Sequence, residues 1–192
     1  MGRNSGGVRG GGAKYTNAQI DKTLHDYVYG EALEINGWLR DHESYDISQE
    51  NLENIKVLDA IAKNKVPDTL YRTTEARSIF GRMSQAEYDE LYMHIIEGKT
   101  SKTMQSRIDG VINKTITDKA YMSTSKSRDI AENLDFSVRP IMLRINSKKA
   151  RGVDVGKHSV GEEEVILKRN TKYRVNKVYG SKGDIYVDVT VI

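Results

Sequence analysis

The sequence predicts an α+β fold in which N-terminal helices precede a largely antiparallel system of strands. Two observations support this prediction. Apolar residues repeat at helical spacing through residues 16–65, whereas the pattern beyond residue 120 is mostly that of short strands. Helices first and strands later are typical of the α+β class. The length of 192 residues suits one domain.

The chain divides into a tail and one folded unit. Residues 1–14 are rich in Gly and Arg, cannot bury apolar surface, and are expected to form a flexible tail. An RNA- or phosphate-binding arm is the alternative for this segment. Residues 15–192 are expected to form a single domain, with a helical part at 15–66 and a β-rich part at 67–192.

Three helical segments are expected before the first strand. The first has a capping residue at Thr16 or Asn17 and carries its apolar side chains on one stripe. The second lies near residues 30–40. The third runs from Gln49 to Asn64 and follows Ser48, a residue type that caps helices well.

The remaining elements follow in order along the β-rich part. A short strand is expected at 70–74 and a helix at 84–97, where Ser84 and Glu87 form a capping box. Residues 98–118 are polar and are expected to be loop with a short turn. A further helix is expected at about 127–135. Other strands are expected at 119–123, 139–146, 163–168, 172–178 and 184–191.

Composition excludes several classes of protein. The net charge of +3, from 30 basic and 27 acidic residues, lacks the single-sign excess of a nucleic-acid-binding protein. There is no Cys, which excludes disulfides and Cys-based zinc sites. No apolar run approaches the ~18–20 residues of a membrane span. No secretory signal is present, so we expect the protein to stay in the cytoplasm of its producer or to be delivered into a target cell as an effector or toxin.

The motifs for metal and nucleotide sites are also missing from the sequence. The four His residues lack metal-ligand spacing, and there is no HExxH. Neither GxGxxG nor a P-loop occurs, so any nucleotide has to bind without a glycine-rich cradle. We therefore expect a site without a metal.

A run of three carboxylates opens one of the expected strands. In a strand, residues two apart face the same side, so Glu162 and Glu164 are expected on one face and Glu163 on the other. Two neighbouring carboxylates repel each other, and such a pair suits a reaction through a cationic, oxocarbenium-like sugar. The alternative is a solvated strand start.

Other polar residues in the β-rich part also suggest a site. Arg72 lies among apolar strand residues and needs an anionic partner, either a phosphate or an internal carboxylate. The triplet 123–125 ends a strand, where its hydroxyls either cap the next helix or brace a carboxylate. Phe136 and Arg139 bring an aromatic face beside a cation, or are simply a core residue and a surface residue.

Taken in this order, the motifs resemble the Arg/Ser-Thr-Ser/Glu-x-Glu class of mono-ADP-ribosyltransferases. The likeness is to the clostridial binary-toxin and exoenzyme-like family, some members of which are phage-encoded. It extends to the segments 34–40, 66–72, 136–140 and 161–165. The resemblance implies a split β-sandwich of two steeply angled, mostly antiparallel sheets, with NAD bound as co-substrate in the cleft and no metal.

The resemblance also implies roles for individual residues. Glu164 is the expected catalytic carboxylate, Ser123 supports it, and Glu162 orients the acceptor. The loop before Gly161, with His158 and Ser159, is expected to recognise the target. Residues implied in NAD binding are Asn36, Arg40, Tyr71, Arg72, Ser123, Thr124, Ser125, Phe136 and Arg139.

The activity implied is transfer of ADP-ribose from NAD to an arginine of a target protein, with release of nicotinamide. A glutamate at position 162 is the family feature associated with arginine acceptors. The alternatives are an NAD glycohydrolase and a non-catalytic phage structural or binding module of the same fold. The partners expected are NAD and a target protein, without nucleic acid, for a monomeric enzyme.

Overall fold

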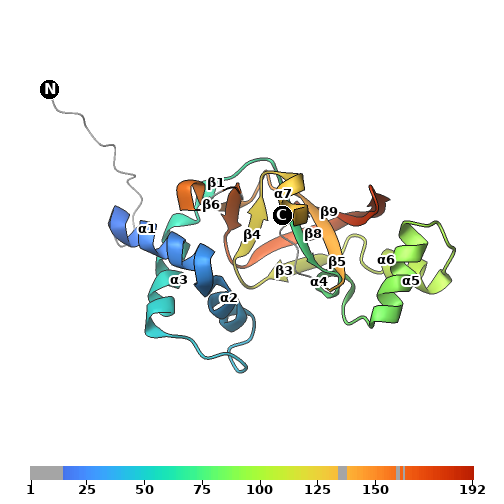
Figure 1. Cartoon of the computed structure of the whole chain (residues 1–192), viewed down its shortest axis with the longest axis horizontal. Coiled ribbons are helices and arrows are strands. Elements are labelled where there is room, and N and C mark those ends of the chain that lie inside the picture. Colours follow the sequence, from blue (N-terminus) through green and yellow to red (C-terminus); the bar gives the residue numbers. More distant parts are fainter. Residues whose placement is uncertain (1–14, 134–137, 159–160, 162) are drawn as a thin grey trace.

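The computed structural model describes residues 15–133, 138–158, 161 and 163–192. Helices of the N-terminal part lie at one side of the molecule, the strands lie in the middle, and a pair of later helices lies at the far side (Figure 1). This arrangement confirms the predicted α+β class. The predicted tail at residues 1–14 lies outside the described residues.

The helical part forms where the capping residues indicated. Thr16 accepts a hydrogen bond from the Gln19 backbone in a capping box, and Ser48 accepts one from the Asn51 backbone. The third helix ends at Ile61, earlier than expected, because the residues that follow pair with a strand. The elements are α1 (Asn17–Asp26), the π-helix η1 (Tyr27–Glu31), α2 (Ala32–Arg40) and α3 (Gln49–Ile61).

The strands form one nine-stranded ladder among the described residues, in the order β1-β6-β7-β4-β2-β5-β9-β8-β3. All neighbours are antiparallel except β5 and β9. A single residue pair, Tyr71 with Ser125, joins β2 to β4, so the ladder divides there into a four-stranded and a five-stranded half. The strands are β1 (Asn64–Lys65), β2 (Thr69–Glu75), β3 (Thr115–Asp118), β4 (Met122–Ser125), β5 (Pro140–Asn146), β6 (Arg151–Asp154), β7 (Glu164–Leu167), β8 (Thr171–Ser181) and β9 (Asp184–Val191).

The interpretation of residues 98–118 as a loop was wrong. The segment contains α6 (Lys102–Asp109), which buries Met104 in the main core, and β3, which pairs with β8. Ser101 caps α6, because its hydroxyl accepts a hydrogen bond from the Met104 backbone N–H. A capping serine is difficult to recognise in a segment that is polar throughout. β6 and the short α4 (Arg77–Phe80) were also not expected, since their pairing and packing depend on distant residues.

The other helices follow the sequence prediction more closely. The capping box of Ser84 with Glu87 is present at the start of α5 (Gln85–Ile95). α7 (Arg128–Asn133) lies within the helix expected at 127–135. A short 3-10 helix, η2 (Gly156–His158), precedes the carboxylate run.

β7 separates two hydrophobic cores. Val165 and Leu167 pack into the main core of the sheets, whereas Ile166 packs with the N-terminal helices. Because strand side chains alternate, Glu164 faces the same side as Ile166. By the same alternation Ser123 on β4 faces the helical part, so the sheet presents both side chains to α1, η1 and α2.

An ion pair fastens the helical part to the sheet. Arg169, in the turn after β7, donates two hydrogen bonds of 2.7 and 2.8 Å to the Asp59 carboxylate on α3. The buried Tyr121 hydroxyl donates to the same carboxylate at 2.8 Å. Burial alone raises the pKa of Asp59, but the hydrogen bonds from Arg169 and Tyr121 outweigh it and hold the pKa below its usual range.

Asp59→Asn is expected to lower the free energy of unfolding by about 1–3 kcal/mol at neutral pH, because it removes a charge-assisted pair. Since the pKa of Asp59 is lower in the folded than in the unfolded chain, this stability is present above the unfolded value of about 3.9 and is lost as pH falls through the folded value. Urea denaturation of both proteins from neutral to acid pH measures the difference.

Glu53→Gln is the matched control, because that carboxylate pairs with Lys56 in solvent on the same helix. It is expected to leave stability unchanged. An equal loss in both variants, or a difference that does not shrink in acid, contradicts the prediction.

Candidate active site

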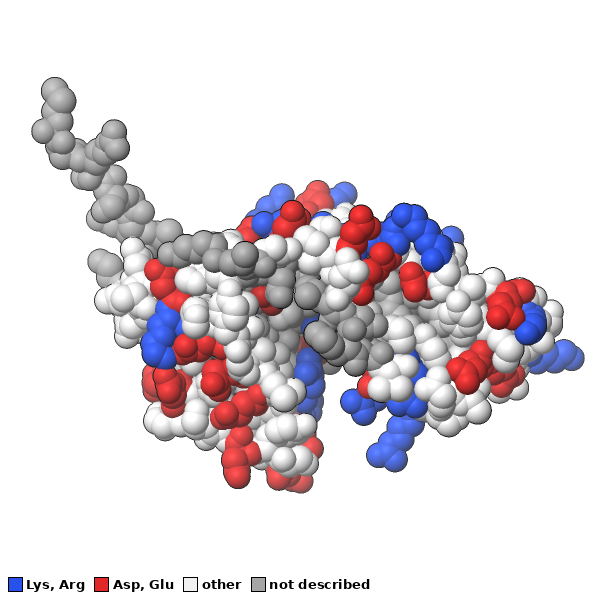
Figure 2. All heavy atoms as spheres, viewed as in Figure 1, with Lys and Arg blue, Asp and Glu red and all other residues white. Residues whose placement is uncertain are grey.

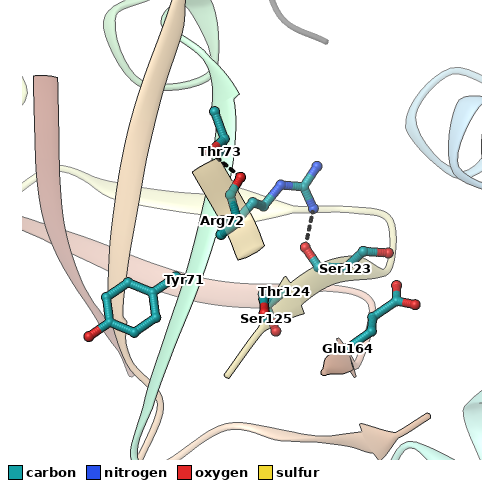
Figure 3. A pocket seen from close by; sticks show the side chains of 8 residues that line it. Tyr71, Arg72, Thr73, Ser123, Thr124, Ser125 and Glu164 are labelled. Atoms are coloured by element: carbon teal, nitrogen blue, oxygen red, sulfur yellow. Dashed lines mark hydrogen bonds between the residues drawn. The ribbon is translucent and has the colours of Figure 1, made fainter. Parts of the chain in front are cut away.

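A cavity of about 190 Å³ lies at the junction of the two halves of the ladder. Its walls come from β2, β4, β7 and α7. Figure 3 shows Arg72 and Glu164 extending to the same side, while the Tyr71 ring points away. The lining residues are Tyr71, Arg72, Thr73, Ser123, Thr124, Ser125, Ala131 and Glu164. The structure therefore brings together the three motifs that are far apart in the sequence.

Arg72 is a half-buried cation without a carboxylate partner among the described residues. Its guanidinium donates to the Ser123 carbonyl at 3.3 Å. Burial lowers the pKa of Arg72, although the group stays charged. The carboxylate whose charge raises the pKa of Arg72, Asp118, is already paired with Arg40 at 3.2 Å. An anionic ligand is the partner that this desolvated guanidinium lacks.

A second cavity of about 490 Å³ shares Arg72 with the first. Figure 2 shows a hollow between the helical part and the α5–α6 side, with basic side chains at its edge. The charged residues that line the cavity are Arg40, Arg72, Arg77, Lys119, Glu75 and Asp118. The excess of cations around a cavity that shares Arg72 with the first fits a negatively charged ligand.

Glu164 is a buried carboxylate at the start of β7. It pairs through its backbone with Ser125, and only 8% of its surface is exposed. The Thr124 hydroxyl donates to the Val165 carbonyl at 2.6 Å, which fixes β4 against β7 beside the carboxylate. A carboxylate held in this way, close to a cation, can stabilise a positive charge that develops on a ligand.

Tyr27 lies behind this pair and was not expected to be part of the site. Burial raises the pKa of its phenol and the charge of Glu164 adds to this, while hydrogen bonds with Asn36 and Ser123 oppose it. The only sequence signal was its place on the apolar stripe of the first helix, which is equally typical of a core residue.

Asn36 and Arg40, one turn apart on α2, were predicted to bind the ligand. Asn36 donates to the Tyr27 hydroxyl at 2.8 Å and accepts from the Tyr121 backbone at 3.1 Å, so it connects α2 to the start of β4. Arg40 lines the second cavity with Arg72. Arg40 therefore lies in the wall of the larger cavity, whereas Asn36 lines neither cavity and connects the helical part to β4. Contact of either residue with NAD stays a prediction.

Arg139 and His158 lie further from the Arg72 cavity. Arg139 forms an ion pair with Glu75 at 2.8 Å and donates to the Met83 carbonyl, and its Nε is buried without a hydrogen-bond partner among the described residues. His158 contacts Asp21 on α1 at 3.1 Å. Contact of Arg139 with NAD, and of His158 with a target protein, stay predictions.

Part of the predicted site lies outside the described residues, namely Phe136, Ser159 and Glu162. Glu163 is exposed and has a left-handed φ of +48°, so regular strand alternation begins only at Glu164. Strand alternation therefore does not extend from Glu164 back through Glu163, and the placement of Glu162 on the face of Glu164 stays a prediction.

The described residues contain no group of three His, Asp or Glu side chains close enough to hold a metal ion together. No helix in the described part of the chain is long and apolar enough to span a membrane.

Comparisons with known proteins agree with this geometry. A family model described as ADP-ribosyltransferase exoenzyme matches residues 11–190. C3stau2 from S. aureus, solved with NAD, has a TM-score of 0.70 at 22% identity, over 94% of this chain and 89% of that chain. The C3 exoenzyme of Clostridium limosum has a TM-score of 0.67 at 16% identity, over 92% and 86% of the two chains.

The enzymatic component C2-I of the C2 toxin from Clostridium botulinum has a TM-score of 0.67 at 21% identity, over 94% of this chain and 44% of that longer chain. A search of the curated proteins found no match. At these identities the solved structures show a shared fold.

Two arginines with opposite surroundings test the electrostatics of the site. In the ligand-free protein, Arg72→Met is expected to leave the free energy of unfolding unchanged or to raise it by up to about 2 kcal/mol, because it removes an unneutralised, desolvated charge. Arg169→Met is expected to lower it by about 1–3 kcal/mol, because it leaves Asp59 without its partner. Urea denaturation measures both, and equal destabilisation by the two variants contradicts the interpretation of Arg72.

Proposed function

The chain belongs to the ADP-ribosyltransferase exoenzyme family, whose reaction is ADP-ribosyl transfer from NAD, and we propose that its acceptor is an arginine of a target protein. The observation that carries the proposal is the pairing of a desolvated, unneutralised Arg72 with the buried carboxylate of Glu164 around one cavity. The cation suits the phosphates of NAD, and the carboxylate suits the sugar that becomes positively charged.

In this proposal NAD lies along the two cavities that meet at Arg72. The Arg72 guanidinium binds the pyrophosphate, because it is the cation that both cavities share. Arg40 extends the positive wall of the larger cavity. Phe136 and Arg139 are proposed to contact the nicotinamide and the phosphates on the strength of the family motif alone.

The proposed chemistry breaks the bond between the ribose C1′ and the nicotinamide nitrogen. The bonding electrons leave with nicotinamide, which is already cationic in NAD and becomes neutral, so no strong acid is needed. The Glu164 carboxylate stabilises the oxocarbenium ion and holds the ribose 2′-hydroxyl. Ser123, on the same face of the adjacent strand, orients Glu164.

The acceptor then attacks C1′ and forms the new glycosidic bond. An arginine has to lose one proton to become nucleophilic, and Glu162 is proposed to orient it and take that proton. Water in the same place gives an NAD glycohydrolase. Glu162 favours the arginine acceptor, since hydrolysis has no need for a group that holds a guanidinium.

The proposal predicts a separation between two variants. Glu164→Gln is expected to reduce nicotinamide release and protein labelling together by at least about 100-fold, since the charge that stabilises the oxocarbenium ion is lost. Glu162→Gln is expected to reduce labelling far more than nicotinamide release, because only transfer needs the acceptor base. Purified protein, labelled NAD and a cell lysate provide both measurements.

Release of the label by neutral hydroxylamine tests the arginine linkage independently. A wild-type protein that neither labels protein nor releases nicotinamide disproves the enzymatic proposal. Labelling that resists hydroxylamine, or that survives Glu162→Gln unchanged, disproves the arginine acceptor. Glu163→Gln is the matched control in the same experiment, because Glu163 is exposed and is the residue between the two proposed working carboxylates.

A further inference from the structure

Two large apolar side chains on the helical part are unusually exposed. Leu33 on α2 is 80% exposed and Tyr29 on η1 is 59% exposed. They are four residues apart, the spacing at which helical residues lie side by side. The Tyr29 ring rests against His25, with the ring centroids 4.7 Å apart. The pair is therefore a small apolar patch on the surface.

Leu33 shares a helical stripe with a residue that lines the larger cavity. Leu33 precedes Asn36 by three residues, and Arg40 follows Asn36 by four, so the three side chains share one stripe. Asn36 reaches Tyr27 and the start of β4, and Arg40 lines the larger cavity. The stripe therefore runs from the exposed patch directly into the wall of the NAD site.

The helical part that carries the patch is mainly acidic. Residues 15–66 hold ten acidic and five basic residues, and Figure 2 shows acidic side chains gathered over the helical part. Asp41, Glu43 and Asp46, just beyond Arg40, are exposed and form no ion pair in the described part of the chain. This negative surface repels the pyrophosphate of NAD, which is a dianion, and it also repels a second copy of itself. A basic partner has the complementary charge.

We infer that Tyr29 and Leu33 form the apolar contact on which the acceptor protein docks at the rim of the cleft. The acceptor carries an aliphatic or aromatic surface residue within a basic region, next to the arginine that enters the site. This inference rests on the proposed transfer to protein and adds the surface that selects the target. Apolar anchors supply most of the binding energy of such contacts, and complementary charge on the surrounding surface steers the partner.

The test compares transfer to a protein with transfer to a small guanidine. The double variant Tyr29→Gln/Leu33→Gln keeps helix-compatible side chains and removes the apolar patch. Wild type and variant are incubated with labelled NAD and either lysate proteins or agmatine, and nicotinamide release is followed without acceptor. Ile192→Gln, which removes a 49% exposed side chain after β9, is the matched control.

Labelling of lysate proteins is expected to fall about tenfold or more in the double variant, the loss typical of an interface anchor. Nicotinamide release and agmatine modification are expected to change less than about twofold. Ile192→Gln is expected to behave as wild type.

Unchanged protein labelling in the double variant overturns the inference, and so does a rise in KM for NAD, which assigns the patch to the co-substrate. A wild-type protein that releases no nicotinamide contradicts the proposed function and not the docking surface alone. A wild type that releases nicotinamide but labels no protein contradicts both the acceptor and the docking surface.

Discussion

A single ladder pair, Tyr71 with Ser125, joins the backbones of the two halves of the sheet, and the site depends on how narrow that junction is. With only one pair joined, β2 and β4 diverge on either side of it. The cavity opens in that divergence, with Arg72 on one wall and Glu164 on the other. A fully paired ladder would bring backbone against backbone and leave no space for a ligand.

The same opening explains why the site is electrostatically unbalanced. Elsewhere the described arginines with buried stems find carboxylates, as Arg139 does at Glu75 and Arg169 at Asp59. Arg72 has only a carbonyl, since Arg40 already occupies Asp118. The protein thus keeps an unsatisfied cation, and in the proposed binding mode this cation lies where NAD carries its two negative charges, a usual compromise between stability and function.

The helical part completes the site rather than merely covering it. Its position is determined by polar contacts, Asp59 with Arg169 and Tyr121, and Asn36 with Tyr121. These contacts place Tyr27 behind Arg72 and Glu164. Leu33 stays exposed on α2, so in our proposals the helices contribute one wall for NAD and one docking surface for the acceptor protein.

The sequence by itself determined the α+β class, most helix starts and the family, because caps, periodicity and the ordered Arg, Ser-Thr-Ser and Glu motifs are local signals. Tertiary structure decided the rest. α6 and β6 form through distant partners, the burial of Glu164 follows from β7 separating two cores, and Tyr27 joins the site through a hydrogen bond from Asn36 on α2. Pairing and burial are relations between remote residues, so no local pattern encodes them.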